Sequence, residues 1–156
     1  MLGVNHVGLS TGSLEQHVAF YRDAAGLAEH ARDGWDTTAR DGDAGSKAQH
    51  VLLDSGNVFI DLTEYEHPRG ARLDPQRPIN DHGLNHLCFD VSEVADLHAA
   101  MVEGGLTYLR APIVMPAGLA AMGYARDPFG NSVELVQNLS PDAAMWCGHL
   151  RSIPVD

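Results

Sequence analysis

The sequence predicts an α+β fold of two βαβββ modules, whose strands form a curved mixed sheet around a metal-binding cleft. Three observations support this prediction: a strand motif that occurs twice, a helical pattern behind each copy, and a hairpin motif near the end of each half. We therefore divide the 156 residues into a first module over 1–67, a linker over 68–81, a second module over 82–138 and a tail over 139–156. All four segments belong to one predicted domain.

Each module begins with a strand that leads into a helix. The strand motif at 5–9, which starts Asn-His, returns at 85–89, and apolar residues recur at helical spacing behind both copies. Such spacing is typical of an amphipathic helix and predicts helices over 14–25 and 94–101. Glycines follow both helices, where backbone in the left-handed region commonly ends a helix. The expected N-cap residues are Ser13 and Ser92.

Each module ends in a β-hairpin. The dipeptides Gly56-Asn57 and Gly130-Asn131 each stand between two runs of β-forming residues, where a tight turn is favoured. Segment 31–47 is rich in Gly and Asp, and we expect it to form a mobile loop. These signals together give each module about three strands after its helix.

Charge and cysteine content argue against several classes of function. The chain has ten Lys and Arg residues and twenty-one Asp and Glu residues. The resulting net charge of −11 opposes binding to nucleic acids and anionic membrane surfaces. No apolar run approaches the ~20 residues that a membrane helix needs. The two cysteines have no metal-binding or redox spacing, so we expect the protein in the reducing cytoplasm. Nine histidines favour a metal or acid–base site.

Four polar residues occupy matching places in the two modules. Side chains alternate across a strand, so His6 and His86 lie on faces opposite the apolar residues of their strands. The same holds for the acids Asp61 and Glu134. Two imidazoles and two carboxylates form a mixed nitrogen and oxygen site for one divalent metal. Zn, Fe, Mn, Co and Ni all accept such donors, and an octahedral ion keeps room for substrate oxygens or water.

A second carboxylate competes with the acid of the first module. Glu64 shares the face of Ile60 and Leu62, so alternation favours Asp61 as the ligand, although Glu64 is close in sequence. The residues expected to line the substrate site are Phe59, Thr63, Tyr124 and His50. Of these, His50 and Tyr124 also fit structural roles.

Four segments resemble the vicinal oxygen chelate superfamily, which includes glyoxalase I, methylmalonyl-CoA epimerase, extradiol dioxygenases, and the fosfomycin and bleomycin resistance proteins. These segments are 5–9, 59–62, 83–91 and 126–135. The last is similar to the final hairpin of the family and is the most specific. The resemblance covers about residues 3–137. It implies paired βαβββ modules around a divalent ion, a substrate that chelates this ion through neighbouring oxygens, and a homodimer.

The donor set permits proton transfer next to a metal-chelated oxygen, and the resemblance implies a divalent-metal-dependent isomerase, epimerase or lyase of the glyoxalase type. A metal-bound carbonyl is polarised, so the C–H bond next to it becomes acidic. Glu134 is the favoured base for this proton, and Asp61 is the fourth ligand or a second base. The predicted substrate is a small organic molecule.

Two other functions stay open. An extradiol-type ring-cleaving dioxygenase uses two His and one Glu on Fe(II) and leaves the fourth position empty. Asp61 would fill that position here, which disfavours the dioxygenase. The second alternative is a small-molecule binding or antibiotic-resistance protein without turnover, which a full set of four metal donors disfavours.

Overall fold

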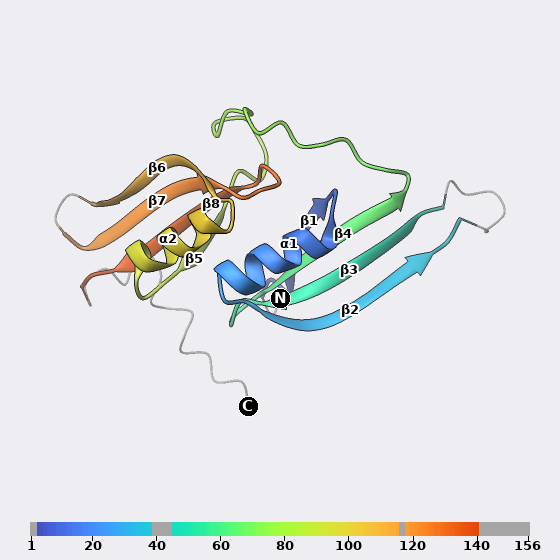
Figure 1. Ribbon diagram of the computed structural model, residues 1–156, viewed down its shortest axis with the longest axis horizontal. Coiled ribbons are helices and arrows are strands. Elements are labelled where there is room, and N and C mark those ends of the chain that lie inside the picture. Colours follow the sequence, from blue (N-terminus) through green and yellow to red (C-terminus); the bar gives the residue numbers. More distant parts are fainter. Residues whose placement is uncertain (1–2, 39–44, 116–117, 141–156) are drawn as a thin grey trace. The chain divides into compact units, whose positions relative to one another are not determined.

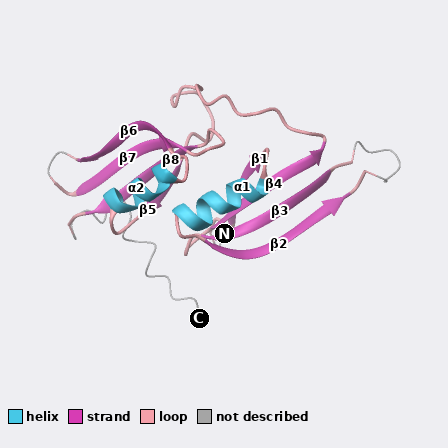
Figure 2. Ribbon diagram, in the orientation of Figure 1, coloured by secondary structure: helices cyan, strands magenta, loops and turns pink. Residues whose placement is uncertain are grey.

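The computed structural model describes residues 3–38, 45–115 and 118–140 (Figure 1). The chain forms two compact units, Met1–Arg72 and Leu73–Asp156, and the division falls inside the predicted linker. Each unit is a four-stranded sheet with one helical segment (Figure 2). Most of the predicted tail lies outside the described residues.

The first unit follows the predicted order of strand, helix and three strands. Its helix continues into one π-helical turn, and the positive φ of Gly26 ends it as expected. The elements are β1 (His6–Thr11), α1 (Leu14–Ala19), the π-helical turn η1 (Phe20–Ala24), β2 (Ala28–Asp36), β3 (Lys47–Asp54) and β4 (Phe59–His67).

The second unit repeats this order without the π-helical turn. Gly104 caps its helix, and Gly105 adopts a positive φ behind it. The elements are β5 (Leu87–Asp90), α2 (Val94–Glu103), β6 (Thr107–Val114), β7 (Ala120–Arg126) and β8 (Ser132–Asn138).

Both sheets are mixed and have equivalent strand orders, β1-β4-β3-β2 and β5-β8-β7-β6. The first strand of each unit pairs in parallel with the last, and the remaining pairs are antiparallel. The parallel pair places the motif strand directly beside the strand that carries the acid. The prediction of an α+β fold with two βαβββ modules is confirmed.

The core of each unit lies on the helix side of its sheet. Val51 of β3 and Leu62 of β4 are fully buried there together with Val18 of α1. Val133 of β8 and Met101 of α2 are the fully buried counterparts in the second unit. Each such side chain contributes roughly 1.5–3 kcal/mol when it leaves water. Because side chains alternate along a strand, Asp61 and Glu134 lie on the opposite faces.

The expected loop over 31–47 is partly wrong, because its first residues belong to β2. Gly34 stands beside β3, and a Cβ atom at this position would lie only 2.7 Å from the backbone oxygen of Ala48. Glycine is therefore needed for close strand pairing here rather than for a turn. Residues 39–44 of the segment lie outside the described residues.

The predicted helix caps are right in position for Ser13 and wrong for Ser92. Ser13 is the N-cap of α1 but makes no side-chain cap bond, and the N-cap of α2 is Glu93 instead of Ser92. The first amide of α1 donates to the Glu64 carboxylate at 2.7 Å, and the first amide of α2 donates to the Gln137 side chain at 3.0 Å. Both acceptors come from the last strand of the module, which ties each helix to the strand that carries the acid.

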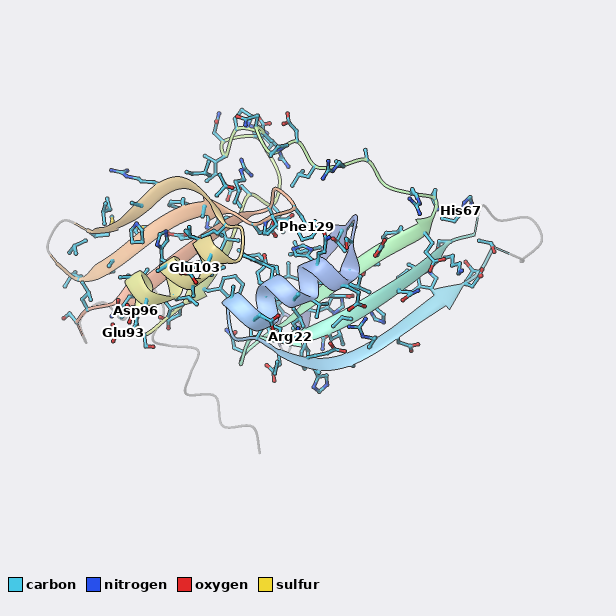
Figure 3. The ribbon with its side chains drawn as sticks, viewed as in Figure 1. Arg22, His67, Glu93, Asp96, Glu103 and Phe129 are labelled. Atoms are coloured by element: carbon cyan, nitrogen blue, oxygen red, sulfur yellow. The ribbon has the colours of Figure 1, made fainter. Side chains whose placement is uncertain are left out.

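The exposed side of α2 is acidic. Glu93, Asp96 and Glu103 are all exposed along this helix (Figure 3). They contribute to the net charge of −11.

Within the part of the chain that the structure describes, no helix is both long and apolar enough to cross a membrane.

Candidate metal centre

The second module holds an imidazole and a carboxylate in direct contact. Cys88 of β5, two residues after His86, stands opposite Glu134 of β8. This register brings the His86 Nε2 atom to 2.9 Å from the Glu134 Oε2 atom. The Glu134 side chain is 7% exposed and that of His86 is 29% exposed. The pair is therefore largely shielded from water.

For a neutral His86 imidazole, the contact places two hydrogen-bond acceptors opposite each other. The Nδ1 atom of His86 donates to the Oδ1 atom of Asn85. In a neutral imidazole with its proton on Nδ1, the Nε2 atom carries no proton and can only accept a hydrogen bond. This atom faces a carboxylate oxygen of Glu134, which is also an acceptor. A cation between them, either a proton or a metal ion, resolves this arrangement. Two ligands with bonds of about 2.1 Å at right angles stand about 3 Å apart, so the pair fits a divalent metal.

Tyr124 of β7 lies beside this pair and stands opposite Glu134 across the sheet. Burial, a hydrogen bond to Glu134 and the charge of that carboxylate together raise the pKa of Tyr124 to about 12. The hydroxyl therefore keeps its proton at neutral pH and donates a hydrogen bond to Glu134. The ring meets the His86 ring edge-on, with the centroids 5.5 Å apart. Tyr124, predicted to bind substrate, is thus a direct neighbour of both predicted ligands.

Ultraviolet titration of the metal-free protein should show that Tyr124 ionises well above its ordinary pKa. We expect a midpoint near pH 12, against an ordinary value of 10.0. Glu134→Gln is expected to lower this midpoint only in part, because burial is the larger cause and persists. Tyr124→Phe assigns the signal. If the signal that Tyr124→Phe removes had its midpoint near the ordinary tyrosine pKa, the hydrogen bond to Glu134 would be excluded.

The first module repeats the arrangement around His6. Gly8 of β1, two residues after His6, stands opposite Asp61 of β4. The His6 Nδ1 atom lies 2.8 Å from the Oδ1 atom of Asn5, which leaves Nε2 available to a ligand. His6 is exposed, and in the described part of the chain no hydrogen bond or ion pair joins it to Asp61.

Asp61 has two partners within its own module. Its Oδ1 atom lies 3.1 Å from the Nδ1 atom of His50 and accepts a hydrogen bond from the Thr63 hydroxyl at 3.3 Å. His50 and Thr63, both predicted to line the substrate site, therefore hold the carboxylate in place. This differs from the second module, where a tyrosine and the motif histidine contact the acid.

The residues that cap the two helices show that the two acids are equivalent positions of the repeat. Glu64 follows Asp61 by three residues and Gln137 follows Glu134 by three, and each accepts a hydrogen bond from the first amide of its helix. Asp61 and Glu134 are thus equivalent positions of the repeat. Glu64, the competing carboxylate, is engaged on the helix side of its sheet.

The described residues do not form a complete group of metal ligands. Over the described ranges, no three His, Cys, Asp or Glu side chains gather into a group that could hold a metal ion.

Phe59, predicted to line the substrate site, lies on the face of Asp61, and the centroid of its ring lies 4.6 Å from that of His30. The structure therefore brings His86 together with Glu134, and His50 and Thr63 together with Asp61.

Two residues that orient the predicted ligands are not among the site residues predicted from the sequence. Asn5 and Asn85 each fix the Nδ1 atom of the histidine that follows. Such partners set the tautomer of a ligating imidazole and its orientation. The signal was present in the sequence, since the complete Asn-His dipeptide recurs in the repeat and not the histidine alone.

Comparison with known families identifies the superfamily of the chain. The model of the Glyoxalase/Bleomycin resistance protein/Dioxygenase superfamily matches residues 3–135. The chain belongs to this superfamily, and the resemblance to the vicinal oxygen chelate proteins is confirmed. A search of curated proteins finds no match to this chain.

Solved structures share the fold at low sequence identity. A glyoxalase family protein from Bacillus cereus is 18% identical with a TM-score of 0.78, and the match covers 90% of this chain and 96% of that one. Glyoxalase I from Zea mays is 18% identical with a TM-score of 0.66, over 88% of this chain and 45% of that one. A trypanothione-dependent glyoxalase I from Leishmania major is 19% identical with a TM-score of 0.62, over 88% and 87%.

Proposed function

We propose that the protein is a divalent-metal-dependent isomerase, epimerase or lyase that moves a proton next to a chelated oxygen of a small organic substrate. The observation that carries this proposal is the contact of His86 Nε2 with Glu134 Oε2 at 2.9 Å, with the other ring nitrogen already engaged by Asn85. This contact supports a cation between two acceptors at a largely buried place. Membership of the superfamily and the matching arrangement in the first module support it as well.

Four side chains would hold the metal, two from each module. His6 and His86 would bind through Nε2, because an asparagine occupies Nδ1 in both. Glu134 would bind through Oε2, and Asp61 through the carboxylate that His50 holds. We propose that the two pairs of donors meet when the modules pair, within one chain or between two chains.

The residues themselves would carry the proton transfer. A bound divalent ion supplies positive charge that polarises the chelated oxygen of the substrate. The proton on the neighbouring carbon then moves to an oxygen of Glu134 and returns to a carbon of the product. Tyr124 keeps its own proton and donates to Glu134, so it holds this carboxylate in one orientation. Asp61 is the alternative base.

Exchange of carbon-bound hydrogen tests this function directly. We would incubate the metal-loaded protein with small α-hydroxy ketones and α-hydroxy aldehydes in heavy water and follow the C–H signals by proton NMR. The expected result is catalysed loss of the signal next to the carbonyl, abolished by Glu134→Gln and retained by Glu64→Gln. Metal-loaded protein that exchanges none of these compounds would contradict the proposal.

A ring-cleaving dioxygenase is the second candidate, and one observation favours it. The Asp61 Oδ1 atom already has partners in His50 and Thr63, so this carboxylate is satisfied without a metal. If Asp61 stays with them, the donors are two histidines and Glu134, the set used by Fe(II) oxygenases. Oxygen uptake with catechol by the Fe(II)-loaded protein is the corresponding test.

We also propose that the protein works in the cytoplasm as a homodimer. The low cysteine content supports a reducing compartment. The resemblance to vicinal oxygen chelate proteins supports the dimer, in which the modules of two chains can share donors. Sedimentation equilibrium measures the mass of the assembly, and a monomer at all concentrations would contradict the dimer.

A further inference from the structure

We propose that the face of the first sheet opposite α1 binds a planar ring that is uncharged or cationic, with Trp35 and Tyr65 as its aromatic wall and Asp33 as its charge partner. The inference rests on the proposed function only in taking this ring to be part of the substrate. Binding of the ring itself depends on neither the metal nor turnover.

The aromatic wall is built from three adjacent strands. The ring of Trp35 in β2 meets the ring of His50 in β3 at 5.7 Å and that of Tyr65 in β4 at 5.9 Å, both edge-on. The indole nitrogen of Trp35 donates to the Ser46 hydroxyl at 2.8 Å, which fixes the orientation of the ring. Tyr65 remains 37% exposed. An oriented aromatic surface that is still open to solvent is a suitable platform for a ligand ring.

The wall shares a face with the candidate metal ligand. Trp35 stands opposite Ala48, and Ala48 stands opposite Tyr65, so these side chains project from one side of the sheet. His50 projects from the same side and contacts both Trp35 and Asp61. A ligand ring on the wall is therefore connected to Asp61 through a single side chain.

The charges on the two faces of this sheet differ. Arg32 and Lys47 are the arginine and lysine of its strands, and the strand register places both side chains on the face opposite the wall. Arg32 forms ion pairs with Glu15 of α1 and with Glu29, and Lys47 forms an ion pair with Glu66 at 2.6 Å. The acids on the wall's face are Asp33, Asp54 and Asp61.

This combination selects a class of ligand. Aromatic faces attract cations and stack on planar rings, and a nearby carboxylate strengthens the attraction for a cation. Asp33 stands opposite His50 in the β2–β3 pair and is exposed, so its charge lies beside the wall. An anionic ring on this face would be repelled by the carboxylates, and no arginine or lysine of these strands would compensate its charge. The face therefore favours quinolinium-like cations and neutral heteroaromatic rings over carboxylated or sulfonated ones.

Three bicyclic probes of similar size test the inference: N-methylquinolinium, quinoline and naphthalene-2-sulfonate. We would use the metal-free full chain carrying Trp146→Phe, which leaves Trp35 as the only tryptophan, and follow its indole N–H resonance by NMR. The cation and the neutral ring are expected to shift this resonance saturably, with the cation bound about three- to tenfold more tightly. The sulfonate is expected to cause no shift.

Variants measured by calorimetry separate the ring from the charge. Trp35→Leu is expected to weaken binding of both the cation and quinoline. Asp33→Asn is expected to weaken only the cation, whereas Asp23→Asn in the helical layer changes neither. Sulfonate binding as tight as that of the cation, or no Trp35 shift with any probe, would overturn the inference. Because no metal is present, these results are independent of a failure of the proposed metal chemistry.

Discussion

Replacing His86 by alanine is expected to remove the divalent ion and to abolish turnover. The Nε2 atom of His86 and the Oε2 atom of Glu134, both predicted metal donors, lie 2.9 Å apart. Loss of this nitrogen should weaken metal binding by more than the ~10–100-fold that the loss of an outer-shell partner typically costs. Elemental analysis of protein purified without a metal-affinity tag measures the ion, with about one per chain expected in the unaltered protein.

Two further variants make this result specific. Asn85→Ala leaves the ligand in place but frees its Nδ1 atom, so we expect an intermediate loss of about 10–100-fold in metal affinity. His82→Ala removes an exposed imidazole from the same module and should leave the metal content unchanged. Two results would contradict a metalloenzyme: full metal content in His86→Ala, or no metal in the unaltered protein after reconstitution. A small-molecule binding protein would then be the better explanation.

Metal binding should also be visible in stability. A ligand that binds only the folded protein adds about 2.7 kcal/mol at a concentration 100 times its dissociation constant. The unaltered protein should therefore melt at a higher temperature when metal is added, and His86→Ala should not. The identity of the retained ion then separates the candidate reactions. Iron would favour the dioxygenase, whereas zinc, nickel, cobalt or manganese would favour the isomerase.

The sequence was sufficient for the repeat and for the face of each candidate ligand. Side chains of successive residues in a strand point to opposite faces of the sheet. Once one apolar residue is assigned to the buried face, the residue next to it must lie on the other face. This is why Asp61 and Glu134 could be separated from Ile60 and Val133 without a structure. The equivalent capping residues now show that the two acids occupy the same place in the repeat.

The sequence was not sufficient where distant residues decide local structure. Ser13 and Ser92 match a local capping pattern, yet Glu64 and Gln137 satisfy the helix amides from strands far away in the sequence. Gly34 resembles a loop residue until β3 is placed beside it, when it becomes a requirement for close strand contact. The contact of His50 with Asp61 likewise depends on the register of β3 against β4.

Asp61→Ala is expected to weaken metal binding, but by less than His86→Ala. Asp61 is held by His50 and Thr63 through one oxygen, so it can contribute a ligand through the other while it stays oriented. His50→Ala should then cost metal affinity by disordering Asp61, and it should add little in the double variant, because both changes act on one carboxylate. Metal titration of the three variants measures this coupling.

Glu64→Gln is the matched control, because it alters a carboxylate three residues further along the same strand but on the helix side. Its amide oxygen still accepts the hydrogen bond from α1, so metal affinity should not change. Unchanged metal affinity in Asp61→Ala as well would show that the fourth position is open. The donor set would then be two histidines and Glu134, and oxygen uptake with catechol by the Fe(II)-loaded protein would decide for the ring-cleaving dioxygenase.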